Sequence, residues 1–197
     1  ALVGLPLHIY TFGTSWSLIG VFVFYLAATG LSITGGYHRL FAHRSYEAKS
    51  MVKLFYLIFG AAACENSVLR WATDHRNHHR FVDRDGDPYN IRLGFFHAHI
   101  GWVFFKDPVF FDKSKDSSVD VARDLKEDPL VCWQDRFYLP IAIIVGGGLP
   151  LLIGYFLGNA LGCFLLAGVA RTVIVHHSTF LINSLCHFLG KQPYSQN

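Results

Sequence analysis

The chain consists of long apolar stretches that flank one polar segment. Residues 14–36 (TSWSLIGVFVFYLAATGLSITGG) contain no charged side chain, and neither do residues 137–170. About 20 helical residues cross the roughly 30 Å apolar core of a bilayer, so residues 14–36 are long enough for one membrane span. The second stretch continues as an apolar pattern beyond Arg171 and is too long for one span.

A turn signal divides the second apolar stretch. Leu157-Gly158-Asn159 is the expected break, because glycine and asparagine favour turns. We expect spans over residues 138–157 and 160–187, the second long and carrying polar groups near its end. The alternative is a buried helical hairpin of a soluble protein, but the sequence contains no amphipathic partner large enough to cover it. The pattern therefore predicts an all-α, polytopic helical membrane protein.

The polar segment, residues 37–137, holds all 14 Asp and Glu and 15 of the 17 Lys and Arg. Because Lys and Arg accumulate on the cytoplasmic side of membrane proteins, we expect this segment to form a cytoplasmic cap. Within it, residues 51–64 are apolar but too short to span a bilayer. We expect them to form a helix at the membrane interface or packed under the cytoplasmic region.

Composition narrows the function classes. Only 16% of the residues are charged and 52% are hydrophobic, which is atypical of a soluble domain. The acidic and basic residues are interspersed, so no basic face for nucleic acid is expected. The four cysteines form no C-x-x-C pair and are interpreted as packed thiols without a disulfide framework. Four arginines of the polar segment are predicted to pair with aspartates and so hold the histidine helix in place; the residues are Arg76, Arg80, Arg84 and Arg92 with Asp74, Asp83, Asp85 and Asp87. The alternative is a solvated charged face, in which individual pairs contribute little.

Histidines supply the candidate chemistry, because imidazole is the commonest metal ligand among side chains. On a helix His75, His78 and His79 would share one face, since residues three and four apart are neighbours. His38 and His43 are five residues apart, about 140° around an ideal α-helix. We therefore predict that these two reach different metals or straddle a helix end.

The last span adds a further pair, Asn183 and His187, one helical turn apart. All these residues are expected on one side of the membrane, just past the ends of spans or within the polar segment. More than five histidines exceed the needs of one tetrahedral zinc, which indicates two metals or some spectator residues. Iron, zinc and copper all bind imidazole. The remaining histidines are not expected to be ligands; they are His8, His97, His99, His176 and His177. His97 and His99 would orient neighbours or fill an interface, and His176 and His177 could support the ligands from behind. A calcium loop over residues 83–87 is rejected, because Gly94 stands where the closing glutamate would be required.

Three segments together resemble the membrane fatty-acid desaturases of the stearoyl-CoA type, which introduce a Δ9 double bond. They are GGYHRLFAHRSYEA, DHRNHHRFVDRDGDPYNIRLGFFHAHIGW and INSLCHFLGKQPY. The H-x4-H and H-x2-H-H boxes, with N-S-x-x-H after the last span, extend over almost the whole chain. The resemblance implies a four-span helical protein whose cytoplasmic cap holds two irons. The implied ligands are His38, His43, His75, His78, His79 and His187, with Asn183 acting through a bound water.

The family also carries an H-N-x-H-H box beyond the last span, and the sequence ends at Asn197 before reaching one. The sequence opens with ALVGLPLHIYTFG, which resembles the tail of a helix whose start is missing. We therefore expect residues 1–197 to be a single desaturase domain that is truncated at both ends.

Substrate residues follow from the same resemblance. Asn66, Trp71 and Asp74 match positions that contact the head group of acyl-CoA. Thr73 replaces a basic residue, and only Lys106, followed by Asp107, remains of a basic cluster. An acyl chain esterified to a membrane lipid is therefore the alternative substrate.

Leu26 and Gly30 match the residues that close the far end of the acyl tunnel. The alternative for Gly30 is that it only permits close helix packing.

The implied reaction needs an oxidant that no side chain supplies, so a redox metal must activate oxygen. The sequence contains no G-x-G-x-x-G fingerprint for a flavin or nicotinamide. Electrons would come from a cytochrome b5 or ferredoxin type of donor with its NAD(P)H reductase, in the endoplasmic reticulum or a bacterial inner membrane. The rival interpretations are a membrane diiron hydroxylase of alkanes or fatty acids and a membrane metal or haem carrier. The carrier is disfavoured because the histidines lie at span ends rather than at mid-span.

Overall fold

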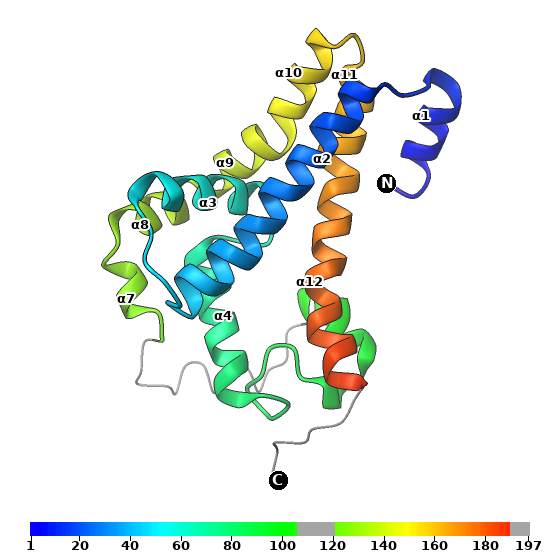
Figure 1. Cartoon of the computed structure of the whole chain (residues 1–197). Coiled ribbons are helices and arrows are strands. Elements are labelled where there is room, and N and C mark those ends of the chain that lie inside the picture. The colour runs from blue at the N-terminus through cyan, green and yellow to red at the C-terminus, as the bar shows by residue number, and fades with distance from the viewer. Residues whose placement is uncertain (106–120, 190–197) are drawn as a thin grey trace. The chain divides into compact units, whose positions relative to one another are not determined.

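The computed structural model describes residues 1–105 and 121–189, and every regular element within these ranges is a helix (Figure 1). The all-α prediction is therefore confirmed. The chain divides into two compact units. The first comprises Ala1–Thr73 and Ala122–His176, and the second comprises Asp74–Val121 and His177–Asn197. Helices α4 (Val68–Phe81) and α12 (Arg171–Phe188) contribute residues to both units.

Three helices are long and apolar enough to cross a membrane, namely Trp16–Ala42, Tyr138–Phe156 and Ala160–Phe188. The second and third agree with the predicted spans to within one residue. The break between them has the expected turn chemistry, since Gly158 adopts φ 77° and the Asn159 side chain accepts a hydrogen bond from the Gly162 amide. The first helix starts after an N-cap at Ser15, and it continues six residues beyond the predicted end at residue 36.

Each candidate span contains a π-helical stretch. The first span joins α2 (Trp16–Leu31) to η1 (Ser32–Ala42). The second span contains α9 (Tyr138–Ile143), η4 (Ile144–Gly148) and α10 (Leu149–Phe156), and the third contains α11 (Ala160–Cys163), η5 (Phe164–Ala170) and α12. Hydrogen bonds in a π-helix join residues five apart, so side chains that would diverge on an α-helix share a face there.

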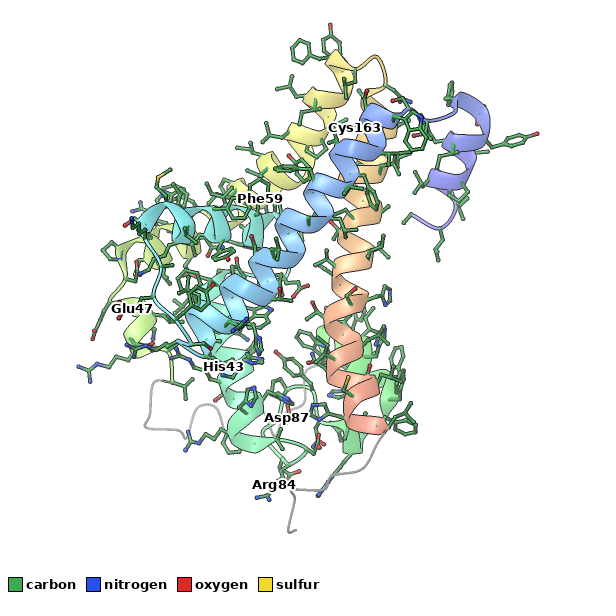
Figure 2. The ribbon with its side chains drawn as sticks, viewed as in Figure 1. His43, Glu47, Phe59, Arg84, Asp87 and Cys163 are labelled. Carbon is green, nitrogen blue, oxygen red and sulfur yellow. The ribbon has the colours of Figure 1, made fainter. Side chains whose placement is uncertain are left out.

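Shorter helices complete the two units. In the first unit they are α1 (Gly4–Phe12), α3 (Ser50–Ala62), α7 (Arg123–Lys126) and α8 (Pro129–Arg136). In the second unit they are η2 (Ile91–Leu93), η3 (His97–Gly101) and α5 (Trp102–Phe104). The predicted short apolar helix is α3, which packs against α2, η1, α8 and α9. Its Phe59 contacts the rings of Phe24 and Tyr25 edge-on (Figure 2).

One arginine is fully buried among the helices of the first unit. The guanidinium of Arg171 donates to the carbonyl oxygens of Ala167 (3.0 Å), Ala62 (2.6 Å) and Gly146 (3.2 Å). Acceptors at a helix end and in a π-helix therefore compensate a charge that would otherwise be costly at this position.

The cysteines form no disulfide within the described residues. Only Cys163 is buried, whereas Cys64, Cys132 and Cys186 are exposed. The interpretation of the cysteines as packed thiols is thus right for one of the four.

Candidate metal centre

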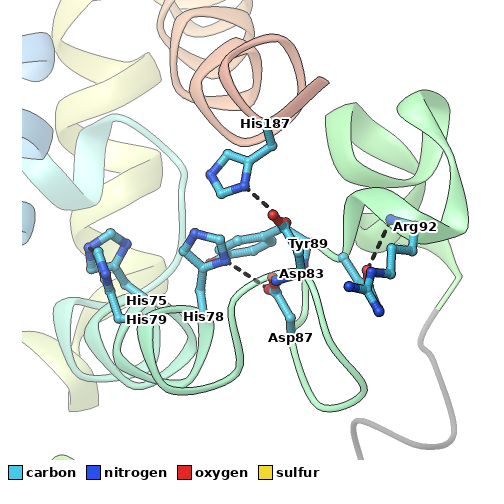
Figure 3. Close-up of polar contacts among 9 residues, drawn as sticks. His75, His78, His79, Asp83, Asp87, Tyr89, Arg92 and His187 are labelled. Atoms are coloured by element: carbon cyan, nitrogen blue, oxygen red, sulfur yellow. Dashed lines mark hydrogen bonds and ion pairs between the residues drawn. The ribbon is translucent and has the colours of Figure 1, made fainter. Parts of the chain in front are cut away.

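Three histidines of the second unit lie on helix α4. The Nε2 atoms of His75 and His79 are 3.1 Å apart, as expected for side chains separated by one α-helical turn (Figure 3). The ring of His78 lies 5.5 Å from that of His79 between centroids. The prediction that these three imidazoles lie close together on one helix is confirmed.

A buried carboxylate fixes the orientation of His78. Nδ1 of His78 lies 2.8 Å from Oδ1 of Asp87, whose side chain has no exposed surface. Asp87 also accepts hydrogen bonds from the backbone amides of Asp83 (2.9 Å) and Tyr89 (2.9 Å), so its own position is fixed. A carboxylate that accepts the Nδ1 proton leaves Nε2 of the imidazole as the free lone pair.

His187 at the end of α12 has the same kind of partner. Its Nδ1 atom lies 3.0 Å from Oδ1 of Asp83, and its ring centroid is 5.0 Å from that of His78 (Figure 3). Two histidines from different helices are therefore each backed by a carboxylate of the 83–87 loop. Asn183, the residue predicted to act through a water, lies one turn earlier on α12.

These contacts correct part of the predicted charge pairing. Within the described residues the carboxylates of Asp83 and Asp87 contact histidines and backbone amides, so the prediction that arginines pair with these two is wrong. The guanidinium of Arg76 donates to the carbonyl of Val121. Arg80 lies over the ring of Phe81, 5.1 Å from its centroid.

His38 and His43 belong to the first unit, where His38 lies on the π-helix η1 and His43 is its C-cap. Their ring centroids are 4.5 Å apart, and each offers a nitrogen within 4.8 Å of the other. The His43 amide donates to the carbonyl of His38 (2.9 Å), five residues earlier. The two residues do straddle a helix end, because His38 lies inside the helix and His43 caps it. The helix continues beyond the predicted span end at residue 36 to Ala42, so His38 lies within its last turns.

The remaining histidines have other contacts. His99 hydrogen-bonds Ser184 Oγ (3.0 Å) and His177 Nδ1 (3.0 Å). His176 lies 2.9 Å from the carbonyl of Ala63 in the first unit, and His8 lies 3.1 Å from the Asn159 side chain. The Nε2 atom of His97 is buried with no hydrogen-bond partner in the described part of the chain.

Two of the predicted head-group residues lie close to η1 in the first unit. Trp71 Nε1 donates to Glu65 (3.1 Å), and the indole meets the ring of His38 edge-on at 6.3 Å between centroids. Asn66 is exposed and has φ 84°. Asp74 begins the second unit, and Lys106 and Asp107 lie outside the described residues.

The predicted tunnel-end residues lie on α2. Leu26 packs against the larger hydrophobic core, which includes Tyr37 and Leu57. A Cβ atom added at Gly30 would meet no atom within 4 Å. Close helix packing therefore does not explain the glycine within the described residues.

Sequence reasoning missed the roles of Asp83 and Asp87. An available signal was the acidic run itself, which directly follows the H-x2-H-H box and fails as a calcium loop. Imidazole nitrogens oriented by carboxylates are a ligand set that suits iron and other transition metals, and hard cations prefer oxygen ligands. The residues present therefore fit a transition-metal centre.

Comparisons with known proteins agree with this chemistry. The family model described as fatty acid desaturase matches residues 14–196. A Schizosaccharomyces pombe protein named "Probable acyl-CoA desaturase" is 45% identical over 87% of this chain and 35% of its own length. "Acyl-CoA desaturase 1" of Saccharomyces cerevisiae is 39% identical over 96% of this chain and 35% of its own length. "Stearoyl-CoA desaturase" of Homo sapiens is 40% identical over 91% of this chain and 50% of its own length.

The chain thus spans about a third of the two yeast relatives and half of the human one. The family match extends over most of the chain and includes both histidine boxes and the N-S-x-x-H segment. The predicted resemblance is confirmed: the chain belongs to the fatty acid desaturase family.

Proposed function

We propose that this chain forms the membrane and metal-binding part of an acyl-CoA desaturase. The enzyme uses O2 to insert a cis double bond, at Δ9, into a saturated fatty acyl chain. The observation that carries the proposal is the pair of carboxylate-backed histidines, His78 with Asp87 and His187 with Asp83. Two such pairs beside His75 and His79 are typical of a metal site, because a ligating histidine usually donates its other ring N–H to a carboxylate.

Two iron ions are the proposed cofactors. The proposed ligands are the six histidines of the boxes and the last span, and Asn183 acts through a water; they are His38, His43, His75, His78, His79 and His187. Iron bound there would supply the oxidising power needed to remove hydrogen from an unactivated methylene.

Asp83 and Asp87 would orient the histidine ligands before a metal binds. Asp87 and Asp83 accept the Nδ1 protons of His78 and His187, so that each ring presents the lone pair of Nε2. Asp87 does this while held by two backbone amides, which limits its movement. Histidines oriented in this way would need less reorganisation to bind a metal.

The acyl substrate is proposed to be a CoA thioester rather than a membrane lipid, because the relatives are named acyl-CoA and stearoyl-CoA desaturases. Asn66, Trp71 and Asp74 would contact its head group. The apolar tail would run between the helices, and Leu26 and Gly30 would limit its length. There is open space beside Gly30 for the end of the tail, because a Cβ atom added there would meet no atom within 4 Å.

Electrons would reach the centre from an external carrier protein of the cytochrome b5 or ferredoxin type, reduced by an NAD(P)H reductase. The carrier and the metal ligands would both lie on the cytoplasmic side of an endoplasmic reticulum or bacterial inner membrane. The excess of Lys and Arg between the first and second spans supports this orientation.

The test is expression of the full-length protein in cells that lack Δ9 desaturation, followed by mass analysis of acyl chains and iron analysis of the purified protein. Products two mass units lighter than the substrate support desaturation, and products sixteen units heavier would identify a hydroxylase instead. Supplying acyl-CoA or acyl-lipid to the purified enzyme with its reductants separates the two substrate classes. His78→Ala should abolish activity and lower iron content, whereas His8→Ala, at a histidine bonded to Asn159, should change neither.

A further inference from the structure

Asn66 is held in an unusual backbone conformation by two tyrosines. Its φ of 84° lies in the left-handed region, which asparagine adopts more readily than most other non-glycine residues. The Asn66 amide donates to the hydroxyl of Tyr138 (3.1 Å), and its carbonyl accepts from the hydroxyl of Tyr37 (3.4 Å). Both backbone polar groups of this residue are thus bound by side chains from other helices.

The Asn66 side chain is oriented by the same turn. Its Oδ1 atom accepts from the amide of Ser67 (3.1 Å), which fixes the plane of the carboxamide. The NH2 group makes no hydrogen bond to the described residues, and the side chain is exposed. The turn therefore presents two amide donors outward in a fixed direction.

Ser67 and Val68, the two residues after Asn66, are held by Asp135 and Gln134 of helix α8. The Val68 amide donates to Oε1 of the fully buried Gln134 (3.1 Å), and the Ser67 hydroxyl donates to Asp135. Gln134 Nε2 in turn donates to the Tyr37 hydroxyl (2.6 Å). Three consecutive residues, 66–68, are thus bound one by one by Tyr138, Asp135 and Gln134.

We infer that Tyr138, together with the Gln134–Tyr37 pair, is a positioning device that presets Asn66 for the polar head group of the substrate. The inference rests on the proposed function, in which Asn66 contacts that head group. Without the two hydroxyls the backbone amide and carbonyl of Asn66 would lose the side-chain partners that hold this turn, so the turn would become less ordered. A donor that is already ordered loses less freedom on binding, so the device acts on affinity.

The test uses Tyr138→Phe in the full-length enzyme with purified reductants and stearoyl-CoA. We expect KM for stearoyl-CoA to rise about five- to tenfold, the effect of one hydrogen bond, with kcat and iron content unchanged. Tyr155→Phe is the matched control, because Tyr155 belongs to the same candidate span but is 71% exposed. It should leave KM unchanged.

A double-variant cycle shows whether Tyr138 acts through Asn66. Asn66→Ala should raise KM, and adding Tyr138→Phe to it should raise KM no further, because coupled residues are not additive. If Asn66→Ala raises KM but Tyr138→Phe does not, the positioning inference is overturned. A fall in kcat or iron content with KM unchanged would overturn it as well, since that outcome indicates a purely structural role.

Failure of the proposed function has a different signature, namely a wild-type enzyme that does not desaturate stearoyl-CoA. If Tyr138→Phe yields no folded protein, Tyr37→Phe removes the second hydroxyl and leaves Tyr138 in place. Tyr37→Phe should then raise KM by a smaller factor, because its contact with the Asn66 carbonyl is longer. An unchanged KM in a folded Tyr37→Phe enzyme would contradict the inference.

Discussion

The Nδ1 atom of His78 lies 2.8 Å from Oδ1 of Asp87, a carboxylate with no exposed surface. Asp87→Asn keeps the shape of the side chain but removes the anion that fixes the imidazole. Losing such a partner typically lowers metal affinity or activity about 10- to 100-fold. We expect Asp87→Asn to reduce iron content and activity together, as measured by metal analysis and product formation. Asp85→Asn, at an exposed aspartate of the same loop, is the control. Full iron content in Asp87→Asn would show that the Asp87 carboxylate has no role in metal binding.

Gly30→Ile tests the proposed tunnel end. The added side chain enters open space, so we expect the product ratio to shift from C18 toward C16 chains while iron content stays constant. Gly20→Ile is a matched control, since Gly20 also lies on α2 and a Cβ there meets no atom within 4 Å. Equal losses on both chain lengths would indicate a distorted helix instead, and an unchanged ratio would remove Gly30 from the tunnel.

The ion pair between Lys53 Nζ and Asp128 Oδ2 (2.7 Å) joins α3 to the N-cap of α8. Burial alone would raise the pKa of Asp128, but the hydrogen bond and charge of Lys53 and the Leu130 amide bring it below its usual value. A lowered pKa in the folded state means that the pair stabilises the protein above the unfolded-state value of about 4 and stops doing so as the pH falls through the folded value.

Lys53→Met should therefore lower thermal stability in detergent at pH 7, by less than about 1 kcal/mol because the pair is partly solvated. The difference from wild type should shrink below about pH 4. Lys49→Met, at an exposed lysine one turn away, should show no such pH dependence. A Lys53→Met difference that persists at acid pH would contradict the assignment.

Arg171→Met should destabilise the first unit, because it removes the hydrogen bonds that the guanidinium donates to the carbonyls of Ala62, Gly146 and Ala167. Each buried acceptor that loses its partner costs about 1–3 kcal/mol, so the melting temperature in detergent should fall by many degrees. Arg171→Lys, which keeps the charge but not the planar set of donors, should fall in between. Arg123→Met removes only an exposed contact to Glu127 and serves as the control. Equal melting temperatures for Arg171→Met and wild type would show that the three hydrogen bonds contribute nothing net.

The spans and their break could be predicted because length and hydropathy set them directly, and because Gly158 and Asn159 have a strong local preference for turns. The grouping of His75, His78 and His79 was also predictable, since an α-helix has a fixed period. The carboxylate partners were not, because they depend on a loop in which Asp83 and Gly86 adopt positive φ and turn the Asp87 side chain back toward the helix. Such a loop is defined by its tertiary contacts and leaves no periodic pattern.

The partners of Asn66 were likewise beyond prediction, because Tyr138 lies 72 residues away along the chain. Only the fold brings the start of α9 to the start of α4 within the first unit. Residue types that form a site through local spacing can be recognised in a sequence, and those that meet through packing cannot.

The π-helix at the end of the first candidate span explains why the two histidine boxes have different spacings. His75 and His79 are separated by three residues on an α-helix, and His38 is separated by four residues from His43, the C-cap of the π-helix, yet both pairs bring two imidazoles together. The number of intervening residues thus matches the type of helix, since the wider π-helix needs one more residue than the α-helix to return to the same face. Removing one residue between His38 and His43 would therefore keep the two imidazoles together only if the segment rewound as an α-helix.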